Sequence, residues 1–562
     1  MSAGSWIRAD CRIDNRAELA AELKAMPGFQ PDGPDSAYIL QAYLRWGEEA
    51  PRRLLGDFAF GIWDERKKQF FCARDPLGLK PFYYHWDGRR FLFGSEIQQI
   101  LQDSSVPSDP NLAHLTDLLL MSPPGQSETP YEAVRKLPPG RSLRIREGEL
   151  EIKPYFEWKP APEKSNRSLQ ENAGIFRELF LQSVRDRLRA GPSGRAGSLL
   201  SGGLDSSAIV AAAAPLQPVL PVFTLSFPEA DPRYKVAWAD WVDETSYVER
   251  MAAAYPGLEP HAVRISSEQF LEDLRDSLQS CEEPLPFPLF PCYRRLFRGA
   301  SDAGVQVMLN GEGGDELFWA PRKPPSPPVS FLPKPVKGLL RKLLRRDIPS
   351  LIRPEFARKA SLPKEDFPSS GILQVLRSGV LPFHLEVFYR LAAGNGMEVR
   401  YPFLDLRLIQ FMASVPSDQK MAGGQRKILL REAMKELLPP EVRLRAGKSE
   451  YSPVIRTLLD RAARPLLEEA LERPHPALDS MVRMKEARRL YRTWFFSPQA
   501  DKPAKNVLSL RQLWYLMTVD QWLKSKRKVD HGKKEGTEAI RFSQVDPLRQ
   551  AHEVDHRSER KP

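Results

Sequence analysis

Cysteine is scarce in this chain of 562 residues, and long apolar runs are absent. The four cysteines, at positions 11, 72, 281 and 292, have no C-x-x-C spacing, which excludes a zinc ribbon and gives no disulfide framework. The longest apolar run, residues 208–216, is too short to cross a bilayer, and the N-terminus has no charged-then-apolar signal pattern. We therefore expect a cytoplasmic protein without a membrane segment.

An excess of one charge is also nearly absent outside one segment. The net charge is +11, but residues 322–359 alone hold eleven Lys/Arg and two Asp/Glu, which accounts for nine of these charges. A basic insertion on a nearly neutral protein argues against a nucleic-acid partner. The 42% of hydrophobic residues exclude a disordered chain and suffice for two packed domains, and the 52 prolines cluster in linkers.

The first part of the chain carries the pattern of an antiparallel α+β unit. A helix is expected over residues 37–49 and strands over 60–63, 70–73, 82–84 and 91–93. Asp87-Gly88 between the last two strands is a strong hairpin signal. The sequence therefore predicts a first domain over residues 1–157, followed by a polar linker at 158–169.

After the linker, strands alternate with helices, which predicts a parallel sheet. We expect helices at 170–189, 206–214 and 244–255, and strands at 198–200, 219–226, 261–265 and 305–309. From about residue 371 the pattern is mainly helical. The predicted fold is thus α/β: a second domain over 170–523 with a helical C-terminal part, a Pro-rich basic insertion at 321–359, and a charged, disordered tail at 524–562.

The run Ser201 to Ser207 (SGGLDSS) follows an apolar strand and opens an Ala-rich helix. Backbone N–H groups at a helix N-terminus attract anions, and glycines let phosphate oxygens approach the backbone. Asp205 offers an oxygen ligand for Mg²⁺. Because no Walker motif is present, we interpret the run as a different phosphate-binding loop, against the simpler alternative of a serine-capped glycine turn.

This loop resembles that of the N-type ATP pyrophosphatases, and two further runs resemble asparagine synthetases and their relatives. These runs are Asn310 to Phe318 (NGEGGDELF) and Gly396 to Asp405 (GMEVRYPFLD). The resemblance implies ATP and Mg²⁺ as cosubstrate and cofactor, with Asp205 and Asp315 as Mg²⁺ ligands. It places the ATP-binding residues at Leu199, Ser201, Gly202, Gly203, Asp205, Ser206, Ser207, Leu225, Asn310 and Gly311.

The same resemblance implies two catalytic residues. Glu398 would take a proton from the attacking amine. Lys448, in the segment Arg445-Ala446-Gly447-Lys448, lies near the position of a lysine that stabilises the charged intermediate. Each run also has a structural reading, as a cap, a surface pair or a solvated basic helix end, but the three runs occur in the family's order.

The N-terminal region resembles a glutamine amidotransferase domain of the Ntn type, entered partway through. Similar runs begin at Arg12, Gly56, Ala73, Lys80 and Gly94. The family's starting Cys, which hydrolyses glutamine, is not found, and Asp10-Cys11 stands where the family has the Asn-Gly that contacts glutamine. We expect a degenerate domain without glutaminase activity, unless Met1 is a misassigned start.

The resemblance implies an ATP-dependent carbon–nitrogen ligase that adenylates a carboxylate and releases AMP. Within the family, the C-terminal part, including residues 445–450 and an aromatic helix at 510–523, looks most like lasso peptide macrolactam synthetases. That implies a precursor peptide as substrate, with a leader-binding protein and a protease as further partners. Asparagine synthetase, a tRNA-modifying pyrophosphatase and a non-catalytic scaffold remain as alternatives.

Overall fold

The computed structural model describes most of the chain, and the statements below concern the described residues. These are residues 4–122, 125–158, 166–191, 194–231, 244–319, 351–357, 376, 379–445, 447, 451–496 and 503–526. Most of the basic insertion, the centre of the expected linker, Lys448, and the tail beyond Lys526 therefore lie outside them.

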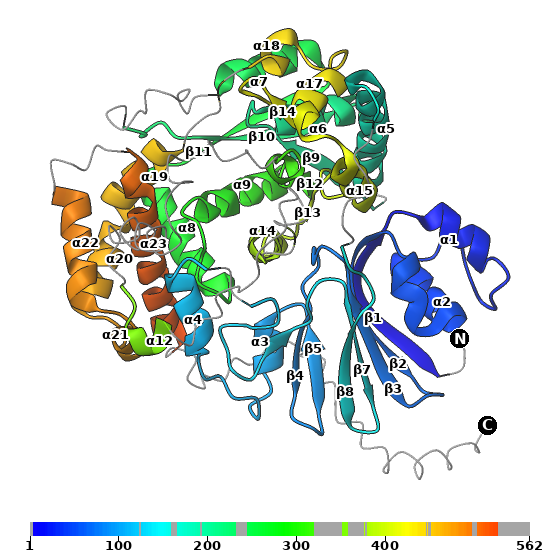
Figure 1. Ribbon diagram of the computed structural model, residues 1–562, viewed down its shortest axis with the longest axis horizontal. Coiled ribbons are helices and arrows are strands. Elements are labelled where there is room, and N and C mark those ends of the chain that lie inside the picture. The colour runs from blue at the N-terminus through cyan, green and yellow to red at the C-terminus, as the bar shows by residue number, and fades with distance from the viewer. Residues whose placement is uncertain are drawn as a thin grey trace, which may run out of the picture.

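The N-terminal part consists of two antiparallel sheets with two helices on the outer face of the larger one (Figure 1). The larger sheet has the order β1-β2-β3-β7-β8 and the smaller one β5-β4-β6. The strands are β1 (Ser5–Ile13), β2 (Gly56–Asp64), β3 (Gln69–Arg74), β4 (Tyr83–Trp86), β5 (Phe91–Gly94), β6 (Arg135–Lys136), β7 (Arg141–Arg146) and β8 (Glu149–Pro154). The helices are α1 (Arg16–Leu23), α2 (Asp35–Trp46), the 3-10 helix η1 (Gly47–Arg53), α3 (Ile97–Leu101) and α4 (Leu112–Leu119).

Side chains of β2 alternate between two cores, as the two-residue period of a strand requires. Phe58 and Phe60 pack in the core beneath α1 and α2, whereas Ala59 belongs to the core between the two sheets. The predicted hairpin is confirmed, because β4 pairs with β5 from Trp86 opposite Phe91, and the Asp87 carboxylate accepts two backbone N–H groups in the turn.

The second part is built on a parallel sheet of order β11-β10-β9-β12-β13. Its strands are β9 (Arg195–Leu199), β10 (Leu220–Ser226), β11 (Leu258–Arg264), β12 (Val305–Leu309) and β13 (Glu398–Arg400). The helices around it are α5 (Leu169–Arg187), α6 (Leu204–Ala213), η2 (Ala214–Leu216), α7 (Thr245–Ala254), α8 (Ser267–Ser280), α9 (Phe290–Asp302) and α10 (Gly314–Leu317). The chain runs outward from β9 to β11 and then returns to the other side of β9 with β12. Ligands of such sheets bind beyond the carboxyl ends of the strands at this reversal.

The C-terminal part is mainly helical, as predicted, and its last helices stack at the left of Figure 1. It comprises α12 (Pro354–Ala357), α14 (Val380–Ala393), α15 (Leu406–Ser414), α16 (Ser417–Lys420), β14 (Met421–Ala422), β15 (Gln425–Arg426), α17 (Ile428–Ala433), α18 (Pro440–Arg443), α19 (Ser452–Leu458), a π-helical turn (Leu459–Ala463), α20 (Arg464–Glu472), α21 (Pro476–Met481), α22 (Met484–Phe496) and α23 (Pro503–Lys526). The predicted aromatic helix is the buried half of α23, whose Trp514 and Trp522 donate to the carbonyls of Leu285 and Glu282. The predicted α/β fold class is thereby confirmed. None of the described helices is long and apolar enough to span a membrane.

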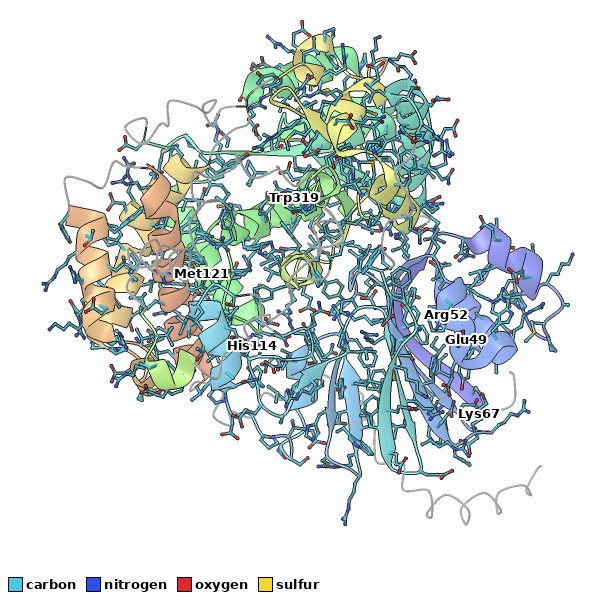
Figure 2. The ribbon with its side chains drawn as sticks, viewed as in Figure 1. Glu49, Arg52, Lys67, His114, Met121 and Trp319 are labelled. Carbon is cyan, nitrogen blue, oxygen red and sulfur yellow. The ribbon has the colours of Figure 1, made fainter. Side chains whose placement is uncertain are left out.

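The two parts meet through a buried ionic network. Glu386 of α14 accepts hydrogen bonds from Arg74 of β3, Lys136 of β6 and Tyr83 of β4, at 2.8, 2.8 and 3.1 Å. Lys136 also reaches Glu283 at 2.8 Å, and His114 of α4 lies at the same junction, with Nε2 3.7 Å from a Glu283 oxygen (Figure 2). N-terminal cations thus face acids of the second part.

These acids stay ionised although they are buried. Burial acts to raise the pKa of Glu386, but the charges of Lys136 and Arg74 outweigh it and hold the pKa below the ordinary value. The same balance, with Lys136 as the main cation, lowers the pKa of Glu283. The junction therefore depends on complete charge pairing.

Removing the charge of Glu386 should expose how much the junction depends on it. Breaking a buried ion pair by removing one partner costs about 3–5 kcal/mol, because the other charge stays buried without compensation. We expect Glu386→Gln to lower the free energy of unfolding in guanidinium by roughly this amount. The exposed Glu472→Gln should change it by less than about 0.5 kcal/mol. Equal unfolding midpoints for the two variants would show that the network does not hold the parts together.

Candidate active site

The predicted phosphate-binding loop, called the phosphate loop below, lies between β9 and α6, where the strand order of the parallel sheet reverses. Gly202 adopts φ +67°, and a Cβ there would come within 2.8 Å of Tyr247 Cβ, so both the backbone angle and the space favour glycine. The Ser206 hydroxyl accepts the backbone N–H of Ser201 at 3.1 Å and lies 3.2 Å from the Gly203 carbonyl oxygen. Ser207 is fully buried beneath the loop. The loop is therefore shaped by its own residues, and the first N–H groups of α6 have no partner within the helix.

Two carboxylates meet beside this loop. Asp205 lies in the first turn of α6 and Asp315 in the first turn of α10, which follows β12. The Lys427 ammonium forms ion pairs with both, at 2.5 Å from Asp315 Oδ1. Asp205 and Asp315, which the resemblance implies as Mg²⁺ ligands, therefore lie close together beside the loop.

Lys427 is the main site residue to which the sequence motifs assigned no role. It stands just before α17 with φ +56°, which is rare for a residue with a side chain. Burial acts to lower the pKa of Lys427, but Asp205 and Asp315 raise it above the ordinary value, so the side chain is an ammonium at neutral pH. Lys427 lies in the run Arg426 to Arg431 (RKILLR), which also resembles the family, and this resemblance was the available signal.

The donor set fits a magnesium ion. Both carboxylates reach the same ammonium, so they can reach one cation, and oxygen ligands are what Mg²⁺ prefers. Gly314 permits this approach, because a Cβ there would lie 2.7 Å from Asp205 Cγ. When bound, the ion would be held by Asp205 and Asp315 and would neutralise phosphate charge.

Arg445 and the residues around it make a second set of contacts with the phosphate loop. The Arg445 guanidinium donates to the Gly202 carbonyl and to Glu244 Oε1, each at 3.0 Å, and lies 4.2 Å from the centre of the Tyr247 ring. Tyr451 donates to the other Glu244 oxygen at 3.1 Å. This arrangement ties the segment that precedes Lys448 to the phosphate loop, although Lys448 itself lies outside the described residues.

The residues expected around adenine lie at the carboxyl ends of the central strands. Leu199 ends β9, Leu225 is the penultimate residue of β10, and Asn310-Gly311 follow β12. Asn310 is buried, and its Nδ2 has no hydrogen-bond acceptor among the described residues. A buried donor without a partner is costly, so it fits a ligand with an acceptor at this place.

Glu398 begins β13, which pairs with β12, so its backbone belongs to the parallel sheet. Its Oε1 lies 3.0 Å from the Lys80 ammonium of the N-terminal part, and its Oε2 lies 2.7 Å from Arg400. Burial acts to raise the pKa of Glu398, but Lys80 and Arg400 hold it well below the ordinary value. Glu398 is therefore an anion, and Lys80 is a second residue whose role the motif reading did not assign.

Comparison with known proteins agrees with this geometry of a phosphate loop and an acid pair on a parallel sheet. The asparagine synthase family model matches residues 175–524, and the glutamine amidotransferase domain model matches residues 3–156. The chain belongs to the asparagine synthase family. It is accordingly an ATP-dependent carbon–nitrogen ligase that forms amides.

Named relatives are mostly asparagine synthetases. Asparagine synthetase [glutamine-hydrolyzing] 3 of Bacillus subtilis is 27% identical over 492 residues, covering 81% of this chain and 79% of that one. A putative asparagine synthetase of Mycobacterium tuberculosis is 29% identical over 493 residues, covering 76% and 72%. Amidase chry2 of Gibberella zeae is 29% identical over 312 residues, covering 54% and 45%. A glutamine phosphoribosylpyrophosphate amidotransferase structure from B. subtilis matches with a TM-score of 0.21 at 12% identity, over 47% of this chain and 62% of that one.

Filling the space at Gly314 should damage nucleotide binding. We expect Gly314→Ala to displace Asp205 and to weaken MgATP binding at least about tenfold, which corresponds to about 1.4 kcal/mol. Isothermal titration calorimetry would measure the dissociation constant. Gly174→Ala in α5 is the matched control, because no atom lies within 4 Å of the added Cβ. Equal affinities for both variants would mean that Asp205 has no part in holding the nucleotide.

Proposed function

We propose that this ligase converts a carboxylate to an acyl adenylate with Mg-ATP and joins it to an amine that does not come from glutamine. The observation that carries the proposal is the placement of Asp205, Asp315 and Lys427 around one point beside the phosphate loop. Two acids and one cation at a helix N-terminus suit a magnesium-bound polyphosphate. A carboxylate oxygen attacks the α-phosphorus, pyrophosphate leaves, and the later attack of the amine on the acyl carbon releases AMP.

Glu398 is proposed as the acceptor of the amine proton. A carboxylate with a lowered pKa is a weak base towards a free amine. As the carbon–nitrogen bond forms, however, the nitrogen becomes positively charged and its N–H far more acidic, so a weak base suffices at that stage. Lys448 is proposed to stabilise the charged intermediate. The hydrogen bond from Arg445 to the phosphate loop supports this role, because it holds the segment that precedes Lys448 beside the loop.

The source of the amine is argued from Asp10. Asp10-Cys11 occupies the position at which the glutamine-using members of the family that this chain resembles carry Asn-Gly. The Asp10 carboxylate accepts a hydrogen bond from Tyr389 at 2.6 Å and lies 2.9 Å from the Lys80 ammonium. An ion-paired carboxylate offers no amide donor to a glutamine side chain, so we propose an amine of other origin.

A peptide macrolactam is the product we propose first, formed between an N-terminal amine and an Asp or Glu side chain. It rests on the resemblance of residues 445–450 and 510–523 in the sequence to lasso peptide macrolactam synthetases. The precursor peptide, a leader-binding protein and a protease are its proposed partners. Asparagine, made from aspartate and ammonia, is the second candidate. The names of the relatives that span most of the chain favour asparagine as the product, although those relatives are named as glutamine-hydrolyzing.

One assay separates the two substrates. Purified chain is incubated with Mg-ATP and either aspartate plus ammonium or a synthetic peptide with a free N-terminus and an internal Asp or Glu. AMP and the amide product are followed by mass spectrometry. Asparagine with stoichiometric AMP would remove the peptide proposal, whereas a dehydrated peptide with AMP, and silence with aspartate, would support it. Absence of AMP with both would contradict the ligase mechanism as proposed.

The acid pair provides the test of the mechanism. We expect Asp205→Asn and Asp315→Asn each to lower AMP formation at least about a hundredfold, because each removes one of two charged ligands for the ion that binds the phosphates. Asp302→Asn is the matched control, since this exposed residue lies before β12, at the opposite end of the strand from Asp315. Retained turnover in both site variants would favour the scaffold alternative.

A further inference from the structure

Lys80 stands at the end of a rigid turn in the N-terminal part. The Asp75 carboxylate accepts the backbone N–H groups of Leu77, Leu79 and Lys80, each at 3.0 Å. Arg74, which pairs with Glu386 across the junction, also donates to the Lys80 carbonyl at 2.7 Å. The backbone from which the Lys80 side chain extends is therefore fixed on both sides.

The Lys80 ammonium is shared between the two parts of the molecule. It lies 2.9 Å from Asp10 Oδ1, on β1, and 3.0 Å from Glu398 Oε1, on β13. It also lies 5.5 Å from the centre of the Tyr389 ring, whose hydroxyl donates to the other Asp10 oxygen. The Lys80 side chain is only 7% exposed, so water screens these contacts little.

Every element near Glu398 contributes to its charge state. Arg400 binds its Oε2, and Arg12 of β1 adds a more distant positive charge. Asp10 and Cys11, also on β1, are further titratable groups on that side, and Tyr389 of α14 donates to Asp10. Among the charges that oppose the effect of burial on the pKa of Glu398, Lys80 has the largest effect.

We propose that Lys80 is a positioning residue for Glu398, through which the amidotransferase-like domain sets the orientation of a residue in the ligase site. This rests on the proposed function of Glu398. Lys80 fixes one carboxylate oxygen, Arg400 fixes the other, and Asp10 holds Lys80 in place from behind. The N-terminal domain then supports the ligase reaction without any turnover of glutamine.

The sign of the pH effect follows from the charges. With Lys80 present, the pKa of Glu398 is held well below its ordinary value, so Glu398 is an anion from pH 5.5 upward. Without it, burial is opposed only by Arg400 and Arg12, so the carboxylate takes up a proton at a higher pH. Loss of Lys80 should therefore reduce amide formation more at acidic pH than at alkaline pH.

The test compares Lys80→Met with the unmodified chain from pH 5.5 to pH 8.5. Amide formation is measured with aspartate and ammonium chloride, or with the peptide where only the peptide gives AMP, and ATP–pyrophosphate exchange is measured in parallel. The rate ratio of variant to unmodified chain cancels the ionisation of the amine itself. We expect this ratio to be at least about threefold lower at pH 5.5 than at pH 8 for amide formation, with exchange retained.

Control variants separate the effect of the Lys80 charge on Glu398 from an effect on packing. Lys80→Arg keeps the cation and should give a flat ratio, as should Lys153→Met, an exposed lysine of the same domain. Lys80→Gln, which is neutral but polar, should reproduce the pH effect if Lys80→Met does not fold. A flat ratio for every neutral variant, with exchange intact, would overturn the proposal. Absence of exchange in the unmodified chain would instead contradict the proposed function.

Discussion

The ion pairs that join Glu386 to Arg74 and Lys136 are the constraint on which the rest of the molecule depends. They are buried, they connect an antiparallel sandwich to a parallel α/β unit, and each charge needs its partner. Arg74 also holds the turn from which Lys80 reaches Glu398. A single network thus connects the two parts and places an N-terminal cation beside a candidate catalytic carboxylate, which supports the proposal that the two parts act together.

Local patterns were sufficient to predict most of the fold. The strand β12 was predicted with its observed bounds, and the hairpin at Asp87-Gly88 formed because the turn chemistry there is strong. Strand–helix alternation likewise predicted the parallel sheet, and the reversal of the strand order at β9 places Asp205 and Asp315 together. These features depend on residues close in sequence or on a topology that has few alternatives.

The contacts that complete the site are not local and could not be predicted this way. Lys80 and Glu398 are 318 residues apart, and Lys427 is 222 residues from Asp205. The hydrophobic periodicity of the sequence does not predict which cation pairs with which acid across a domain junction. The three residues Glu398-Val399-Arg400 were too few to predict a strand from the sequence. Their pairing with β12 is decided by the tertiary structure. Lys448 stays a prediction.

The account as a whole requires that a carboxylate oxygen of the substrate becomes bonded to the α-phosphorus of ATP. In the proposed mechanism, the phosphate loop, the acid pair and Lys427 serve that step, and Glu398 with Lys80 serves the one that follows. The most direct measurement uses a substrate whose carboxylate carries ¹⁸O, with mass spectrometry of the released nucleotide. Transfer of one ¹⁸O atom to AMP is the predicted result. Amide formation with unlabelled AMP, or with ADP and labelled phosphate, would contradict the account.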